Sequence, residues 1–227
     1  MRERRRPAAI IDFGMGNLFS VRQACEHAGL QAVVTSDPEE VLAADAVILP
    51  GVGAFGDAMA ALTRQGLVEV LQDLAGTGRP FLGICLGMQL LMTESEEFGR
   101  HAGLCIIPGG VTRLAESDGT GARVKVPQVG WNRIQRPGGV SWEHSVLEGI
   151  PEEAFMYFVH SFYVAPEDPG IVLSTTRYGS TAFCSSLRRG NLFACQFHPE
   201  RSGPSGVRIY RNFARQVAQA AMEVERV

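Results

Sequence analysis

Short apolar runs alternate with segments of helical periodicity through the first half of the chain. An apolar run of four or five residues bounded by turn residues is typical of a buried strand, whereas apolar residues three and four apart predict one face of a helix. The predicted strands are Ala8–Asp12, Gln31–Thr35, Ala46–Leu49 and Pro80–Ile84. The predicted helices are Asn17–Ala28 (closed by Gly29), Pro38–Ala44, stretches after Gly56 as far as about Ala75, and Leu86–Thr93. Buried strands interleaved with helices favour a parallel sheet that is covered on both faces.

The pattern changes after Gly103, where strand-like segments follow one another without intervening helices. These segments are Ile106–Leu114, Arg123–Val129, Phe155–Val164, Ile171–Arg177, Thr181–Leu187 and Leu192–Gln196. Turn residues separate them, and helical periodicity returns only at Val207–Val224. We therefore predict an α/β fold. It consists of an open, mostly parallel twisted sheet with helices on both faces, plus additional mixed or antiparallel strands in the C-terminal half.

No repeat, linker or low-complexity segment divides this pattern, so we expect a single domain over residues 8–227. Residues 1–7 are basic, and we interpret them as a flexible tail ahead of the first strand. A secretory leader would need a longer apolar run than Ala8–Ile11, which ends at Asp12.

The composition narrows the class of protein further. The 227 residues are 45% hydrophobic and 20% charged, which excludes disordered and fibrous chains. The net charge of −3 gives no reason to expect a nucleic-acid partner. No stretch approaches the ~20 apolar residues that span a bilayer, so no membrane is expected. The five cysteines are odd in number and form no C-x-x-C pair, which predicts a reducing cytoplasm rather than a disulfide framework.

The segment Gly83-Ile84-Cys85-Leu86-Gly87 follows an apolar strand and opens a predicted helix. A sharp strand-to-helix turn strains its central residue, and glycines two positions away on either side leave room for it. The Cys85 thiol would project at the carboxyl edge of the sheet, where open α/β folds bind ligands. It would also lie at a helix N-terminus, which favours the thiolate. Free cysteines are otherwise small buried hydrophobic residues, an interpretation that we keep for Cys25, Cys105, Cys184 and Cys195.

A cysteine nucleophile needs a base, and the base needs a group that orients it. The best candidate is His198, because Pro199 disfavours the helical region for the residue before it. In an extended segment residues two apart share a face, so Glu200 can address the His198 ring. The alternative is a surface-loop histidine beside a solvated carboxylate. No further clustered His or Cys completes a metal site with Cys85, so we expect no metal.

Acyl transfer also needs hydrogen-bond donors for the developing oxyanion. We expect one from the N–H of Leu86, directly after the nucleophile. The second is expected from Val52 or Gly53 in the loop Pro50–Gly53, whose glycines let peptide planes turn inward or flip without a Cβ clash. The alternative is an ordinary glycine-rich turn.

The run Gly14-Met15-Gly16-Asn17-Leu18-Phe19 also follows a strand and opens a helix, as a dinucleotide-binding fingerprint would. Phe19 stands where that fingerprint needs a glycine for close helix–strand packing. We therefore interpret the run as a tight surface loop that contacts a partner or a substrate channel.

Together these motifs resemble the class I (triad) glutamine amidotransferases, through Gly83–Gln89 and through His198-Pro199-Glu200. Four further segments narrow the resemblance to the glutaminase subunits of imidazole glycerol phosphate synthase, an enzyme of histidine biosynthesis. These segments are Asp12–Asn17, Pro50–Gly53, Gly130–Asn132 and Phe158–Ser161. The similarity extends over residues 10–213, and its motifs are specific in combination.

The resemblance implies a defined chemistry that needs no cofactor. Cys85 would attack the side-chain amide carbon of L-glutamine, and His198, held by Glu200, would protonate the leaving ammonia. Water would then hydrolyse the glutamyl thioester to glutamate. The residues implied to hold the substrate are Gly53, Gln89, Ser161 and Phe162.

The resemblance also implies a partner, a (β/α)8-barrel cyclase that forms a heterodimer with this chain and receives the ammonia. The cyclase would make imidazole glycerol phosphate and aminoimidazole carboxamide ribonucleotide. The residues implied to lie toward it are Asn17, Trp131, Asn132, Tyr157 and Arg201. One departure is Gln128-Val129, where the family usually has His followed by Met or Ile. This departure concerns docking and touches no catalytic group.

Three alternatives share part of the pattern. The glutaminase of another pathway, for anthranilate or purines, would have the triad but not Asp12–Asn17 and Gly130–Asn132. A stand-alone hydrolase with an elbow cysteine would turn over glutamine fully without a partner. A catalytically silent binding subunit would not keep Cys85, His198 and Glu200 together.

Overall fold

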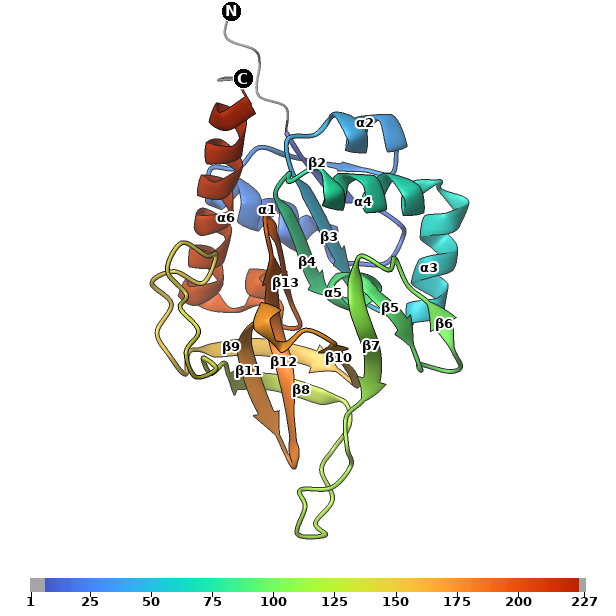
Figure 1. Ribbon diagram of the computed structural model, residues 1–227, viewed down its shortest axis with the longest axis vertical. Coiled ribbons are helices and arrows are strands. Elements are labelled where there is room, and N and C mark those ends of the chain that lie inside the picture. The colour runs from blue at the N-terminus through green and yellow to red at the C-terminus, as the bar shows by residue number, and fades with distance from the viewer. Residues whose placement is uncertain (1–6, 225–227) are drawn as a thin grey trace, which may run out of the picture.

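A seven-stranded sheet runs through the centre of the computed structural model, which describes residues 7–224 (Figure 1). In sheet order its strands are β11 (Val172–Tyr178), β12 (Thr181–Arg189), β13 (Leu192–Cys195), β4 (Phe81–Cys85), β3 (Val47–Gly51), β1 (Ala8–Ile11) and β2 (Ala32–Thr35). The five strands from β13 to β2 are parallel, and β12 and β11 extend one edge in antiparallel fashion.

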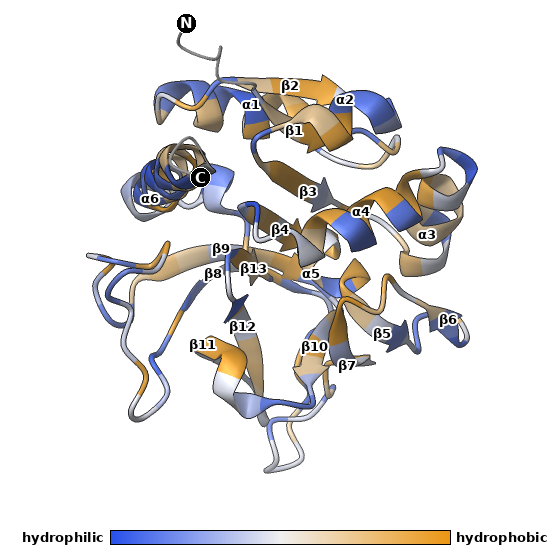
Figure 2. Cartoon of the chain, turned by 45° about the horizontal axis from the view of Figure 1, so that its top comes forward, coloured by the Kyte–Doolittle hydropathy of each residue, from blue (hydrophilic) through white to orange (hydrophobic). Residues whose placement is uncertain are grey.

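Helices cover both faces of this sheet because neighbouring residues of its strands point to opposite sides. Ala9 and Ile11 belong to the hydrophobic core beneath α2 (Pro38–Ala43), α3 (Phe55–Arg64) and α4 (Leu67–Gly76). Ala8 and Ile10 belong to the core beneath α1 (Leu18–His27) and α6 (Gly203–Val224). Figure 2 shows the inner strands as mostly hydrophobic, whereas the helices alternate between hydrophobic and hydrophilic residues. These observations confirm the predicted fold class.

Side-chain caps begin the first two helices. The Asn17 side chain accepts a hydrogen bond from Ser20 N at 3.3 Å at the start of α1. Asp37 accepts from Glu39 N at 2.9 Å at the start of α2, whose first residue is Pro38. Both arrangements satisfy backbone N–H groups that a helix leaves without an internal partner.

The other strands form two smaller sheets. One has the order β10 (Phe162–Pro166), β7 (Ile107–Arg113), β5 (Met92–Ser95) and β6 (His101–Ala102). The second is the antiparallel pair β8 (Gln128–Arg133) and β9 (Phe155–His160). The remaining helices are the short α5 (Leu86–Leu90) and the 3-10 turns η1 (Pro169–Ile171) and η2 (Pro199–Arg201).

The predicted helix Leu86–Thr93 is wrong beyond its first five residues. Helix α5 ends at Leu90, and the chain then enters β5. The carbonyls of Leu90, Leu91 and Met92 accept hydrogen bonds from N–H groups of residues 104–107, at 2.8 to 3.1 Å. These tertiary bonds replace the local bonds that would continue the helix.

Two predicted strands are also misplaced. The strand predicted at Arg123–Val129 lies instead at Gln128–Arg133, because Pro127 has no N–H for a ladder and β8 begins after it. The single strand predicted at Phe155–Val164 is divided at Ser161 into β9 and β10, which belong to different sheets. The Ser161 carbonyl accepts from Leu114 N at 2.8 Å, outside both ladders.

Two sequence predictions concern the ends of the chain and the membrane. Residues 1–6 of the predicted basic tail lie outside the described residues. Within residues 7–224, no helix is both long and apolar enough to cross a membrane.

Candidate active site

Cys85 lies at the turn between β4 and α5, with φ of 54° and ψ of −108°. Such a backbone is strained for a residue with a side chain, and it is held by the packing around it. A Cβ at Gly87 would lie 1.7 Å from the Leu49 carbonyl oxygen of β3, so only glycine fits there. The strand-to-helix turn predicted from the flanking glycines is therefore present. The neighbouring strand β3 is the reason why residue 87 must be a glycine.

The Cys85 sulfur is almost fully buried and lies near two polar groups. It lies 3.9 Å from the Val159 carbonyl oxygen, which can accept from the thiol. The Gln196 side chain donates to the sulfur from Nε2 at 3.6 Å. The sulfur therefore has a hydrogen-bond partner in either protonation state. A thiol can donate to the Val159 carbonyl, and a thiolate can accept from Gln196 Nε2.

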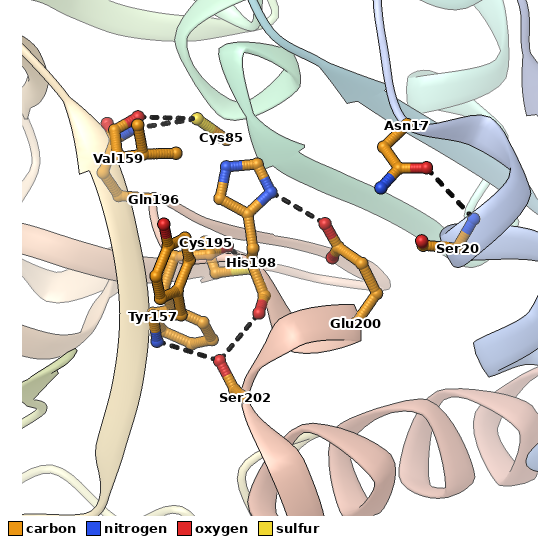
Figure 3. A network of polar contacts seen from close by, with 11 residues as sticks. Asn17, Ser20, Cys85, Tyr157, Val159, Cys195, Gln196, His198, Glu200 and Ser202 are labelled. Atoms are coloured by element: carbon orange, nitrogen blue, oxygen red, sulfur yellow. Dashed lines mark hydrogen bonds and ion pairs between the residues drawn. The ribbon is translucent and has the colours of Figure 1, made fainter. Parts of the chain in front are cut away.

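His198 and Glu200 meet where η2 follows β13. His198 Nδ1 lies 2.8 Å from Glu200 Oε1, and both side chains are more than nine-tenths buried. Figure 3 shows the His198 ring between Cys85 and Glu200, with the Glu200 carboxylate on the side away from the sulfur. His198 Nε2, the ring nitrogen that does not face Glu200, makes no hydrogen bond of normal geometry to a described residue, and the ring interacts with the Cys85 sulfur.

The backbone of His198 is fixed by strand β9 and by a serine. His198 N donates to the Tyr157 carbonyl at 2.9 Å, and Ser202 Oγ donates to the His198 carbonyl at 2.7 Å. Tyr157 N in turn donates to Ser202 Oγ at 3.0 Å (Figure 3). This closed set of bonds orients the imidazole independently of substrate.

The pKa of His198 is raised from 6.5 to about 10. Burial alone would lower it, but the Cys85 sulfur and the hydrogen-bonded Glu200 carboxylate outweigh burial, because both stabilise the protonated ring. Protonated His198 therefore favours the folded state. Its contribution to the free energy of unfolding is complete below about pH 6.5 and is lost as the pH rises through about 10.

We expect the Glu200→Gln variant to have a lower His198 pKa than the wild type, since one of the groups that raise it loses its charge. The measurement is a histidine NMR titration of both proteins. His160 can be told apart from His198 in this titration, because burial and the nearby positive charge of His198, only partly offset by the bond to the Phe162 carbonyl, lower its pKa to about 4. An unchanged His198 titration would show that Glu200 does not stabilise the protonated ring.

A cavity of about 270 Å³ opens beside Cys85. Its size is close to the lower end of the range for small-molecule sites. Its lining residues are Val52, Gly53, Cys85, Leu86, Gln89, Glu97, Pro127, Val159, His160, Ser161 and Phe162. All residues predicted for the oxyanion hole and for substrate binding are among them, although they come from separate parts of the chain.

Gln89 lies on α5, one helical turn after Cys85, and its amide is held in one orientation. Gln89 Nε2 donates to the Phe162 carbonyl at 2.9 Å and to Gln196 Oε1 at 3.0 Å. Both N–H groups of this amide are therefore used inside the protein, and only its carbonyl oxygen remains for a ligand.

The loop that follows β3 brings Val52 and Gly53 to the same cavity. Gly51 pairs with Cys85 across β3 and β4, which places the start of the loop beside this cysteine. Gly53 has φ of +112°, a conformation suited to glycine. Leu86 provides the first N–H of α5, and the first N–H groups of a helix have no partner within it.

Comparison of the sequence with known proteins identifies the family of the chain. A sequence profile described as "Glutamine amidotransferase class-I" matches residues 9–217. The chain belongs to the class-I glutamine amidotransferases. It is 49% identical over 217 residues to "Imidazole glycerol phosphate synthase subunit HisH" of Moorella thermoacetica, covering 95% of this chain and 97% of that protein. It is 51% identical over 207 residues to the protein of the same name from Syntrophotalea carbinolica, covering 90% and 97%.

Solved structures agree with this membership at the level of the fold. "Crystal structure of glutamine amidotransferase" has a TM-score of 0.69 at 18% identity and covers 93% of this chain and 98% of that chain. "Structure of PurLQS from Thermotoga maritima" has a TM-score of 0.68 at 15% identity, with coverage of 93% and 99%. The profile match and the two HisH relatives confirm the family resemblance predicted from the sequence motifs.

Three further residues near Cys85 or its cavity are absent from the predicted site. Glu97 lines the cavity and accepts from Phe55 N at 2.7 Å, which caps α3 and fixes the carboxylate in place. His160 also lines the cavity, and its Nδ1 lies 2.8 Å from the Phe162 carbonyl. Gln196 contacts the Cys85 sulfur. Two of the three have a sequence signal. His160 lies in the motif Phe158–Ser161, and Gln196 is two positions from His198, the spacing used in the argument for Glu200.

The residues implied to face a partner fall into two groups. Trp131, Tyr157 and Arg201 are stacked together, with the Arg201 guanidinium 4.2 Å above the Tyr157 ring and Trp131 edge-on to that ring at 6.0 Å. Asn17 instead caps α1, and Asn132 donates from Nδ2 to the Arg177 carbonyl of β11 at 2.9 Å. The structure therefore brings three of the five together.

The remaining cysteines lack the setting of Cys85. Burial raises the pKa of Cys25 to about 12 and raises the pKa values of Cys184 and Cys195 as well, which keeps all three as thiols. The prediction of a buried cysteine is wrong for Cys105, which is exposed and whose thiol lies 3.7 Å from the Thr93 and Gly103 carbonyls. Over residues 7–224 there is no group of three or more His, Cys, Asp or Glu side chains that could hold a metal ion.

Proposed function

We propose that this chain is the glutaminase subunit of imidazole glycerol phosphate synthase, hydrolysing L-glutamine to glutamate and ammonia for a cyclase partner in histidine biosynthesis. The observation that carries the proposal is the buried Cys85–His198–Glu200 arrangement beside a cavity of about 270 Å³, in a chain about half identical to HisH subunits. We propose that residues 8–227 form a single glutaminase domain.

In this proposal the Cys85 thiolate attacks the side-chain amide carbon of glutamine and forms a tetrahedral intermediate. The N–H groups of Leu86 and of the Val52–Gly53 loop stabilise its oxyanion. His198 then gives a proton to the amide nitrogen, the C–N bond breaks, and ammonia leaves a glutamyl thioester. Water attacks the thioester as His198 takes a proton, which releases glutamate and restores Cys85.

The polar groups of the cavity suit the α-ammonium group of an amino-acid substrate. Gln89 presents only its carbonyl oxygen, and Glu97 contributes a carboxylate, so both groups accept hydrogen bonds from the α-ammonium group of glutamine. Gly53 and the backbone of Ser161 and Phe162 complete the binding site. No cofactor is required by this chemistry.

The open face of the β8–β9 pair is the proposed docking surface for the cyclase. Cross-strand pairing places Trp131 opposite Tyr157 and Val129 opposite Val159 on one face of this pair. Trp131 and Val129 are more than half exposed, which is unusual for large apolar side chains. Tyr157 also lies 6.5 Å from the His198 ring, so this face connects directly to the triad and offers ammonia a short route to the partner.

The test of the proposal is glutamine hydrolysis by the chain alone and with the cyclase and its nucleotide substrate. We expect low activity alone and at least about a tenfold increase in the complex, because release of ammonia without an acceptor wastes glutamine and the Pro50–Gly53 loop can reorient its peptide planes. Cys85→Ser in the same complex is the control. Full turnover without the partner would favour a stand-alone hydrolase, and stimulation only by an anthranilate or purine synthase subunit would favour another pathway.

A further inference from the structure

Gln196 follows β13 and has no exposed surface. Its backbone N donates to the Ser185 carbonyl at 2.9 Å, which continues the pairing with β12 for one residue beyond the strand. Gln196 and His198 are two positions apart in this extended segment, so their side chains point to the same side. The segment therefore directs both Gln196 and His198 toward Cys85.

A series of hydrogen bonds links the Phe162 carbonyl, Gln89, Gln196 and the Cys85 sulfur. The backbone carbonyl at one end determines which atom of each amide donates and which accepts. The Phe162 carbonyl can only accept, so Gln89 turns its Nε2 toward it. The same Nε2 donates to Gln196, which must therefore present Oε1 to Gln89. Gln196 Nε2 is left to face the Cys85 sulfur, at 3.6 Å.

One end of this series of hydrogen bonds acts on the Cys85 sulfur, and the other end acts on Gln89, which is proposed to bind the substrate. At one end, an N–H donor directed at sulfur stabilises a thiolate more than a thiol, since hydrogen bonds to a charged acceptor are the stronger ones. At the other end, the Gln196 oxygen keeps the Gln89 carbonyl turned toward the cavity. If the Gln89 amide were reversed, it would present N–H donors where the ammonium group of the substrate also brings donors.

We propose that Gln196 is a positioning residue that holds the Cys85 thiolate and the Gln89 amide through one carboxamide. The assignment of Gln89 to substrate rests on the function proposed above, whereas the contact with the sulfur does not. Gln196 touches neither the substrate nor the leaving group, and it acts through the two side chains on either side of it.

Two variants of similar volume separate the two roles. Gln196→Met removes both hydrogen bonds, whereas Gln196→Glu keeps an acceptor for Gln89 and replaces the donor facing Cys85 by oxygen. The first readout is the pH dependence of Cys85 alkylation by iodoacetamide, which needs no glutamine. The second is the separation of kcat from KM for glutamine in the cyclase complex.

For Gln196→Met we expect the midpoint of alkylation to move up by about one pH unit, kcat to fall by about tenfold and KM to rise by about fivefold or more. For Gln196→Glu we expect an upward midpoint shift at least as large, with KM nearer the wild-type value. The other titratable groups around the sulfur and its cavity are Glu97, His160, Cys195, His198 and Glu200. These are the same in both variants.

Asn212→Leu is the matched control. Asn212 is a buried amide on α6 that donates to the Val146 and Glu148 carbonyls at 2.9 Å, and none of these residues lines the Cys85 cavity. Its loss should lower the melting temperature but leave the alkylation midpoint and KM unchanged. If Gln196→Met does not fold, Gln196→Glu carries the test, because it fills the same space.

A wild-type alkylation midpoint together with a wild-type KM in a folded Gln196 variant would overturn the proposal. So would equal changes in the Asn212→Leu control, which would indicate a general loss of stability. Wild-type protein that does not hydrolyse glutamine with the cyclase would refute the proposed function instead. The alkylation profile would still decide whether Gln196 acts on the sulfur.

Discussion

Replacing Cys85 by serine is expected to lower glutamine hydrolysis by roughly four orders of magnitude or more while leaving the protein folded, because members of a catalytic triad act as a unit. A serine hydroxyl at this position fits the space of the thiol but is a far weaker nucleophile at neutral pH. The measurement is glutamate release in the presence of the cyclase, beside a thermal melt of each protein.

Cys105→Ser is the matched control for this prediction. Cys105 is exposed and does not line the cavity, so its loss should leave hydrolysis close to the wild-type rate. If Cys85→Ser retained a tenth of the wild-type activity, the nucleophile would have to be another group. A serine variant that hydrolysed nothing but had also unfolded would be repeated as Cys85→Ala, which adds no polar group to the buried turn.

The second large effect is expected for Gly87→Ala, a change of one methyl group. The added Cβ would lie 1.7 Å from the Leu49 carbonyl oxygen, and both atoms belong to secondary structure that holds Cys85 in place. Backbone must move to relieve this contact, so we expect a loss of at least about 3 kcal/mol in the free energy of unfolding. The soluble fraction should also lose most of its glutaminase activity.

Gly76→Ala separates this clash from a general effect of adding a methyl group. Gly76 ends α4, and a Cβ there would meet nothing within 4 Å. Alanine should be neutral or slightly stabilising at this position, by up to about 1 kcal/mol. Denaturant unfolding of the two variants gives the comparison, and equal stabilities would show that β3 can yield at Leu49.

The proposed nucleophile and its proposed base are recognisable in the sequence because their signals are local. Glycines two residues from Cys85 indicate the strained turn, and Pro199 keeps His198 extended so that Glu200 can reach it. The strand-to-helix alternation of the first half is equally local, and it predicts the parallel sheet correctly. The family is recognisable for the same reason, since each of its motifs is a short run of adjacent residues.

Errors arise where distant segments compete for backbone hydrogen bonds. The helix predicted to continue after Leu90 ends because residues 104–107 donate to its last carbonyls. The strand predicted through Ser161 divides because its halves pair with different sheets. The local sequence of a segment does not show which distant segment will bond to it, since a backbone carbonyl can accept from any N–H group.

The amino-acid order alone therefore dictated which residues can react, because strain, extension and helix periodicity depend on neighbours a few positions apart. Only the folded chain decided what surrounds them. Glu97 and Gln89 line the cavity beside Cys85 from a hairpin and a helix, and Gln196 reaches the sulfur from the end of a strand. The Phe162 carbonyl orients the amides of Gln89 and Gln196. Such an arrangement depends on long-range pairing, in which each hydrogen bond is short in space but joins residues up to about a hundred positions apart.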